Sequence, residues 1–109
     1  AYNELKHYEE AVKQYNLAIE IKADYPALFF SKAMALSNLG KTLGALEGYS
    51  KAIALDPQYA DAHYYLGLIQ MKMGSLKKAI ESFDRVVAIN PHYDGVQAQR
   101  ERVLSTLKQ

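Results

Sequence analysis

The chain has 109 residues, and its 13 Lys and Arg nearly balance its 12 Asp and Glu. Such a balance lacks the strongly basic surface with which proteins bind nucleic acids or anionic membranes. The chain contains no Cys, which excludes disulfides and thiolate metal sites.

No apolar run approaches the roughly 20 residues of a membrane span, and the first residues do not form a secretory signal. The absence of cysteine fits a reducing compartment. We therefore expect an intracellular, cytoplasmic protein that binds neither membrane nor nucleic acid.

The predicted elements are all helices, and turn signals separate them. The first helix carries apolar residues at helical spacing, namely Ala11, Val12, Tyr15, Ala18 and Ile19. The next two are predicted over 27–39 and 42–55, divided by Gly40 and ended by Pro57. A second pair is predicted over 61–73 and 76–89, divided by Gly74 and ended by Pro91.

The last segment, 94–109, differs from the earlier helices because much of its surface is polar. Its apolar residues share one face: Val96, Val103, Leu104 and Leu107. Polar residues cover much of the remainder, among them Gln97, Gln99, Arg100, Arg102 and Lys108. This pattern is typical of the capping helix that ends a helical solenoid.

A period of 34 residues runs through the chain. It relates Ala11 to Ala45 and Ala79, Tyr15 to Tyr49 and Phe83, and Tyr25 to Tyr59 and Tyr93. The same step relates Gly40 to Gly74, Ala33 to Gly67, and Pro57 to Pro91. A fixed period of this length indicates an array of repeated helix pairs. We call the first helix of each pair the A helix and the second the B helix.

These residues resemble the tetratricopeptide repeat, whose pattern is W-x2-L-G-x2-Y, then A-x3-F, then P. The third unit reads His63-x2-Leu66-Gly67-x2-Gln70, then Ala79-x3-Phe83, then Pro91. The second unit reads Phe29-x2-Lys32-Ala33-x2-Leu36, then Ala45-x3-Tyr49, then Pro57. Lys32 and Gln70 depart from the pattern, and Pro26 falls three residues late, with Ala23 at the expected proline position.

The resemblance implies an all-α fold, a right-handed superhelical solenoid of antiparallel helix pairs. We expect one domain over 1–109: an incomplete first repeat over 1–25, repeats over 26–59 and 60–93, and a capping helix over 94–109.

The first repeat is the irregular one. Tyr2 matches the A-helix tyrosine of the family, so most of the first A helix has no counterpart here and we expect a fragment of a longer protein. One face of the following B helix would then be only partly covered: Tyr8, Ala11, Val12 and Tyr15. This open face is the basis of an alternative function, a structural segment that stacks on another copy.

No cluster of residues suggests chemistry. His7, His63 and His92 lie far apart in the sequence, and His63 occupies the family's tryptophan position, which predicts a packing role. The carboxylate pair Glu9 and Glu10 falls on an exposed helix face. We therefore predict no catalytic, cofactor or metal site and no enzymatic activity.

In the family, the A helices line a concave groove that holds a peptide. Transferred residue by residue, the groove positions are mostly apolar and aromatic, and such side chains are enriched at interface centres. We predict that the chain is a scaffold or adaptor whose protein or peptide partner contacts Phe30, Ser31, Met34, Asn38, Asp61, Tyr64, Tyr65, Leu68, Met71 and Lys72.

One variant of the groove is disfavoured. Family members that hold the C-terminal carboxylates of heat-shock chaperones use a clamp of Lys, Asn and Arg on the A helices. Ser31, Asp61 and Tyr65 stand at matching positions here. We therefore expect the ligand to be an apolar stripe of an extended segment or one face of a helix.

Overall fold

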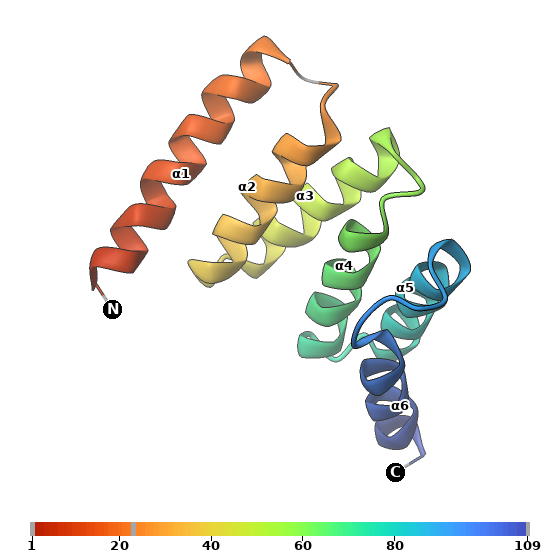
Figure 1. The fold of residues 1–109 in the computed structure, drawn as a ribbon. Helices are drawn as coiled ribbons and strands as arrows, with labels where there is room; N and C mark the ends of the chain where they lie inside the picture. Colours follow the sequence, from red (N-terminus) through yellow and green to blue (C-terminus); the bar gives the residue numbers. More distant parts are fainter. Residues whose placement is uncertain (1, 23, 109) are drawn as a thin grey trace. The chain divides into compact units, whose positions relative to one another are not determined.

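The computed structural model describes residues 2–22 and 24–108, and every regular element in them is an α-helix. In chain order these are α1 (Tyr2–Ile21), α2 (Pro26–Asn38), α3 (Thr42–Leu55), α4 (Ala60–Lys72), α5 (Leu76–Ile89) and α6 (Val96–Leu107) (Figure 1). The all-α prediction is confirmed, and the bounds predicted for α2 to α5 differ from these by at most one residue.

Contacts divide the chain into two compact units, Ala1–Pro57 and Gln58–Gln109. In the first unit α2 packs against both α1 and α3, and in the second α5 packs against both α4 and α6. Each unit therefore holds one complete pair of an A helix and a B helix, α2 with α3 and α4 with α5, together with one extra helix.

The same glycine turn joins both helix pairs. Gly40 and Gly74 have φ angles of 80° and 83°, a region that residues with a Cβ atom rarely adopt. The Gly40 and Lys41 amides donate to the carbonyls of Ser37 and Leu36, at 3.0 and 2.9 Å. The equivalent bonds recur beside Gly74. This arrangement is the Schellman motif, which satisfies the last carbonyls of the A helix and reverses the chain.

The first repeat differs at this turn. The residue 34 places before Gly40 is Lys6, and α1 runs through it without a break. The family pattern places Tyr2 in an A helix, whereas the structure includes it in the same 20-residue helix as the B-type residues. Without a glycine to take up positive φ, the helical conformation continues.

The core of the first unit is built from small residues and one large ring. Ala33, Ala45 and Ala52 have no exposed surface, and Tyr49 is 2% exposed. Gly48 allows α3 to approach α2, since a Cβ atom added to it would lie 2.8 Å from Cβ of Ala33. The short contact shows that the two helix backbones could not come so close with a larger residue at position 48.

The core of the second unit joins α5 to α6. Ala79, Phe83, Val86, Val96 and Val103 form one buried cluster in which none is more than 1% exposed. Two of the four apolar residues predicted for one face of the capping helix, Val96 and Val103, thus belong to this core. Leu104 is half-buried and Leu107 is 41% exposed.

A polar pair explains the departure from the family pattern at Gln70. The Ser82 hydroxyl on α5 donates to Oε1 of Gln70 on α4 at 2.6 Å. The corresponding residues of the first unit, Leu36 and Gly48, are apolar and both buried. A hydrogen-bonded pair therefore replaces an apolar contact at the same helix junction, which avoids an unsatisfied buried hydroxyl.

Candidate protein-binding surfaces

Three of the four residues predicted on α2 line a cavity of about 470 Å³ between α1 and α2. Ser31, Met34 and Asn38 face it from α2, because their spacing of three and four residues places them on one side of the helix. Ala35 joins them, and the opposite wall comes from His7, Tyr8, Ala11 and Tyr15 of α1. The cavity is thus lined by two tyrosine rings and a methionine, with polar groups interspersed.

Phe30, the fourth predicted residue, is placed differently. Its ring lies 5.6 Å from the ring of Tyr49 on α3, at an interplanar angle of 56°. Phe30 is half-buried, and it does not line the cavity between α1 and α2. Its contact with the core residue Tyr49 shows that it contributes to packing within the first unit.

On α4, Tyr64 is the centre of an aromatic cluster. Its ring lies 5.5 Å from Tyr65 in an edge-to-face contact, 5.9 Å from Phe83 and 4.9 Å from Tyr93. Its hydroxyl lies 3.1 Å from where a Cβ atom of Gly95 would be, at the residue that precedes α6. Tyr64 is half-buried and links α4 to the segment that leads into α6.

The other predicted residues of α4 fall into two groups. Leu68 and Met71 are half-buried and pack against the core cluster of α5 and α6. Asp61 and Lys72 lie at opposite ends of the helix and are exposed. Asp61 accepts a hydrogen bond from the Tyr93 hydroxyl. Leu68 and Met71, which were predicted to contact a partner, therefore contribute to the packing between helices.

The surroundings of the Tyr93 hydroxyl on the segment before α6 shift its pKa clearly. Partial burial raises this pKa above its ordinary value of 10.0. The hydrogen bond to Asp61 and the negative charge of the Asp61 carboxylate raise it further. The folded protein therefore favours the protonated phenol.

A pH dependence follows with a definite sign. Because the folded pKa of Tyr93 is higher than the unfolded one, its contribution to stability is complete below pH 10 and is lost as the pH rises above it. We expect Tyr93→Phe to lose less free energy of unfolding than the wild type between pH 9 and about pH 11.5. Urea unfolding across that range measures the difference. Parallel curves for both proteins would contradict this assignment.

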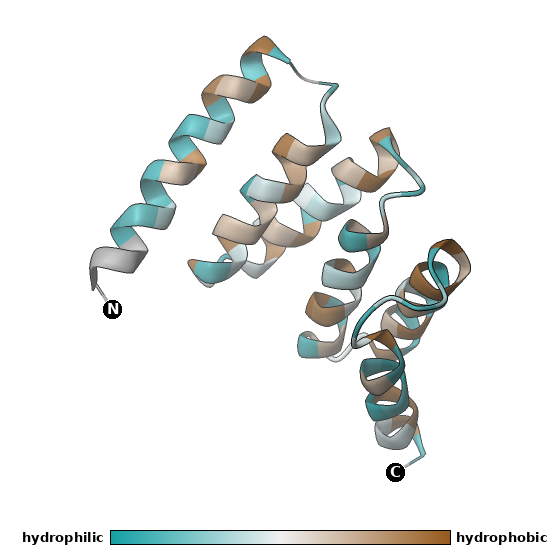
Figure 2. Cartoon of the chain, in the orientation of Figure 1, coloured by the Kyte–Doolittle hydropathy of each residue, from teal (hydrophilic) through white to brown (hydrophobic). Residues whose placement is uncertain are grey.

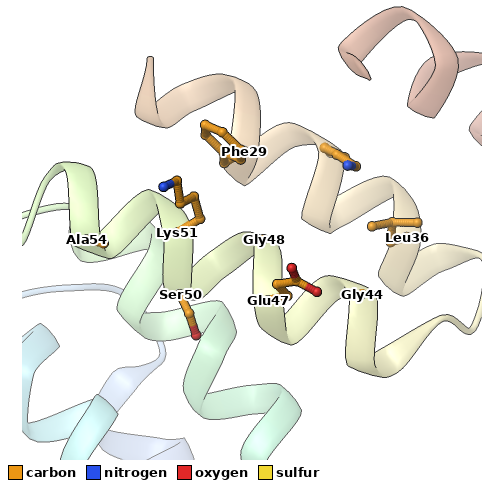
Figure 3. Close-up of a pocket in the computed structure, with 9 residues that line it drawn as sticks. Phe29, Leu36, Gly44, Glu47, Gly48, Ser50, Lys51 and Ala54 are labelled. Carbon is orange, nitrogen blue, oxygen red and sulfur yellow. The ribbon is translucent and has the colours of Figure 1, made fainter. Parts of the chain in front are cut away.

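A second cavity was not predicted from the sequence. It has a volume of about 550 Å³ and lies on the surface of α2 and α3 (Figure 3). Phe29 and Leu36 line it from α2, and Gly44 and Gly48 line it from α3. The Lys51 ammonium lies 6.0 Å from the centre of the Phe29 ring, at the outer limit of a cation–π contact. Gly44 and Gly48, which lack side chains, leave the space on the α3 side of this cavity.

His63 is 8% exposed, as predicted for a packing residue at the family's tryptophan position. None of the described helices is long and apolar enough to cross a membrane.

Comparison with known protein families gives three matches. A model described as "TPR repeat" matches residues 35–74, and two described as "Tetratricopeptide repeat" match residues 60–93 and 1–25. A search of curated proteins found no match to this sequence.

Solved structures with the same fold include several tetratricopeptide repeat domains. The first such domain of Spaghetti (RPAP3), bound to the HSP90 peptide SRMEEVD, is 22% identical with a TM-score of 0.92, covering 99% of this chain and 86% of that one. The second domain of human RPAP3, with the HSP70 peptide SGPTIEEVD, is 25% identical with a TM-score of 0.83, covering 89% and 81%. The Sgt2 domain from Aspergillus fumigatus is 26% identical with a TM-score of 0.86, covering 94% and 70%.

The 34-residue period, the glycine turns between paired helices, the three repeat matches and the shared fold lead to one conclusion: this chain belongs to the tetratricopeptide repeat family.

Proposed function

We propose that this chain is a protein-interaction module that binds a peptide or helical segment of a partner through side chains of its A helices, α2 and α4. The cavity between α1 and α2 carries this proposal. Its volume, about 470 Å³, is large enough to accept several apolar side chains. Tyrosine and methionine, which line it, are enriched at interface centres, and methionine adapts its shape to different partners.

The α4 residues support the same function in a more limited way. Tyr65 is half-buried and contacts Tyr64 edge to face, so its ring is held in a defined orientation. An oriented aromatic ring loses little conformational entropy when a partner binds it. Asp61 and Lys72 add one charge of each sign to the exposed ends of α4.

Relatives with this fold hold acidic peptides that end in EEVD. The proposed ligand of this chain is of a different kind. Ser31, Asp61 and Tyr65 stand where a carboxylate clamp would need Lys, Asn or Arg, and Asp61 adds a negative charge that would repel an acidic terminus. The lining of the α1–α2 cavity instead favours apolar side chains of the partner.

Two matched variants test this function. Met34→Glu places a charge in the α1–α2 cavity, whereas Leu43→Glu makes the same kind of change on α3, where Leu43 is 71% exposed. We expect a partner captured from lysate by the wild type to be retained by Leu43→Glu and lost by Met34→Glu, because an apolar ligand would leave the new carboxylate buried and unpaired.

Circular dichroism must first show that both variants remain helical. Capture that is equal for all three proteins would refute the use of this cavity. If the peptide SRMEEVD displaces the captured partner, the proposal of an apolar ligand is wrong and a chaperone-type clamp is favoured instead.

A further inference from the structure

Four side chains from α4 and from the segment before α6 form one patch, which we call the tyrosine–aspartate patch: Asp61, Tyr64, Tyr65 and Tyr93. The Tyr93 hydroxyl donates a hydrogen bond to Oδ1 of Asp61, and the Tyr93 ring lies 4.9 Å from the ring of Tyr64. Tyr64 in turn contacts Tyr65 edge to face at 5.5 Å. Figure 2 shows hydrophilic residues in the first turn of α4 and apolar residues further along the helix. The patch thus places a carboxylate beside three aromatic rings.

Two members of this patch have no chemical counterpart in the preceding repeat. The residue 34 places before Asp61 is Ala27, which has no carboxylate. The residue 34 places before Tyr65 is Ser31, which has no ring. The other two members keep aromatic counterparts, as expected of rings that pack between helices. Packing common to the repeats therefore accounts for those two rings but not for Asp61 or Tyr65.

The electrostatic surroundings of the patch favour a positive charge. Asp61 is exposed, and because only Oδ1 accepts the Tyr93 hydroxyl, its carboxylate has lone pairs for about three further hydrogen bonds. Burial and the Asp61 carboxylate raise the pKa of Tyr93, and the phenols of Tyr65 and Tyr64 raise it further. These groups therefore disfavour a further negative charge and would stabilise a cation placed beside them.

The spacing of the rings distinguishes between two kinds of cation. A quaternary ammonium, such as methylated lysine, binds inside a cage of aromatic rings. The rings here contact one another at 4.9 and 5.5 Å, which leaves no room for a cation between them. A flat guanidinium instead stacks on the outer face of a ring and donates two parallel hydrogen bonds to a carboxylate. Asp61 and Tyr65 are four residues apart on α4 and so lie on one side of it, as that contact requires.

We infer that the tyrosine–aspartate patch binds an arginine side chain of the partner protein. The guanidinium pairs with the Asp61 carboxylate and rests on the ring of Tyr65, while the Tyr93 hydroxyl holds the carboxylate in place. This inference rests on the proposed function and specifies one residue of the ligand. The relatives solved with peptides ending in EEVD hold acidic residues, so the patch selects a ligand of the opposite charge.

The chain's own arginines do not occupy the patch. All three lie in α5 and α6, in the same compact unit as α4. Arg100 pairs with Asp84 at 2.7 Å, and within residues 2–22 and 24–108 no ion pair joins an arginine to Asp61. The A-type helices that precede and follow α4 in the repeat order, α2 and α6, both belong to the described chain. The patch is therefore not a gap left by a neighbouring helix of α4.

The probe is N-acetyl-arginine amide, and its matched control is N-acetyl-citrulline amide, which has the same shape but an uncharged urea group. We expect the arginine derivative to shift the amide resonances of residues 61–65 of the wild type, with saturation at millimolar concentrations. The citrulline derivative should bind roughly tenfold more weakly, because it cannot form a charged pair with a carboxylate. Two-dimensional proton–nitrogen NMR measures both affinities. Equal affinities, or shifts that are absent from α4, would overturn the inference.

Two carboxylate variants locate the binding site. Asp61→Asn removes the charge but keeps an oxygen that can accept the Tyr93 hydroxyl, and it is expected to weaken arginine binding roughly tenfold. Glu81→Gln removes an exposed carboxylate from α5 and is expected to leave binding unchanged. Equal weakening by the two variants would mean that arginine is attracted only by the overall charge, and the inference would be wrong.

A second pair of variants tests the ring. Tyr65→Leu is expected to weaken arginine binding roughly threefold, whereas Tyr65→Phe keeps the ring and most of the affinity. Circular dichroism must first show that each variant remains helical. The comparison of arginine with citrulline requires only wild-type protein, so it still tests the inference if a variant does not fold.

Sedimentation of the wild type tests another occupant. Self-association that Asp61→Asn removes would mean that a second copy supplies the cation, and the assignment to a partner would be wrong. If Met34→Glu loses its captured partner but the arginine derivative does not bind, the proposed function stands and this inference is refuted. If the arginine derivative binds at Asp61 and capture is insensitive to Met34→Glu, the arginine site stands and the proposed use of the α1–α2 cavity fails.

Discussion

Replacing Phe83 with alanine is expected to destabilise the protein by about 3–5 kcal/mol, a large part of the roughly 5–15 kcal/mol that stabilises a typical domain. The Phe83 side chain has no exposed surface, belongs to the core cluster of α5 and α6, and contacts the ring of Tyr64. Its removal would leave a cavity that α4, α5 and α6 all border. Urea unfolding followed by circular dichroism at 222 nm measures the loss.

The matched control is Tyr15→Ala, at the position 68 residues earlier. Tyr15 is only half-buried and lines a cavity, so fewer contacts are lost and no enclosed void is created. We expect a loss of no more than about 1–2 kcal/mol, since stabilisation follows the apolar area removed from water. Equal losses for the two variants would contradict the difference in burial between α1 and α5.

Gly67→Ala is the second substitution with a large expected effect. A Cβ atom at position 67 would lie 2.6 Å from Cε1 of Phe83 and 2.9 Å from Cδ1 and Cζ. The ring has no exposed surface and cannot move aside without displacing the core. We expect a net destabilisation of about 1–3 kcal/mol, although alanine favours a helix over glycine by about 1 kcal/mol.

Gly44→Ala separates the steric effect from the helix preference. Its Cβ atom would lie 3.2 Å from Cδ1 of Leu36, the end of a flexible side chain. We expect this variant to be neutral or more stable by up to about 1 kcal/mol, because the helix preference dominates there. Thermal unfolding of both glycine variants would reveal the contrast, and a stabilised Gly67→Ala would show that α4 and α5 can separate without loss.

Local chemistry in the sequence was sufficient to predict the elements and the family. Gly40 and Gly74 end the A helices because they readily take up positive φ, and Pro57 and Pro91 follow the ends of the B helices because proline cannot continue the hydrogen-bond ladder. Apolar spacing within 42–55 and 76–89 predicted α3 and α5 with the bounds that the structure shows. These features depend on residues a few positions apart.

Only the tertiary structure decided how far each apolar side chain is buried against its neighbours. The family resemblance placed Phe30, Leu68 and Met71 on the predicted binding faces. In the structure Phe30 packs against Tyr49, and the other two pack against the core shared by α5 and α6. Ala11 and Ala79 share a residue type and a repeat position, so the sequence pattern cannot show that Ala11 is only half-buried whereas Ala79 is fully buried. Burial depends on whether another helix lies opposite, and that contact joins residues distant in the chain.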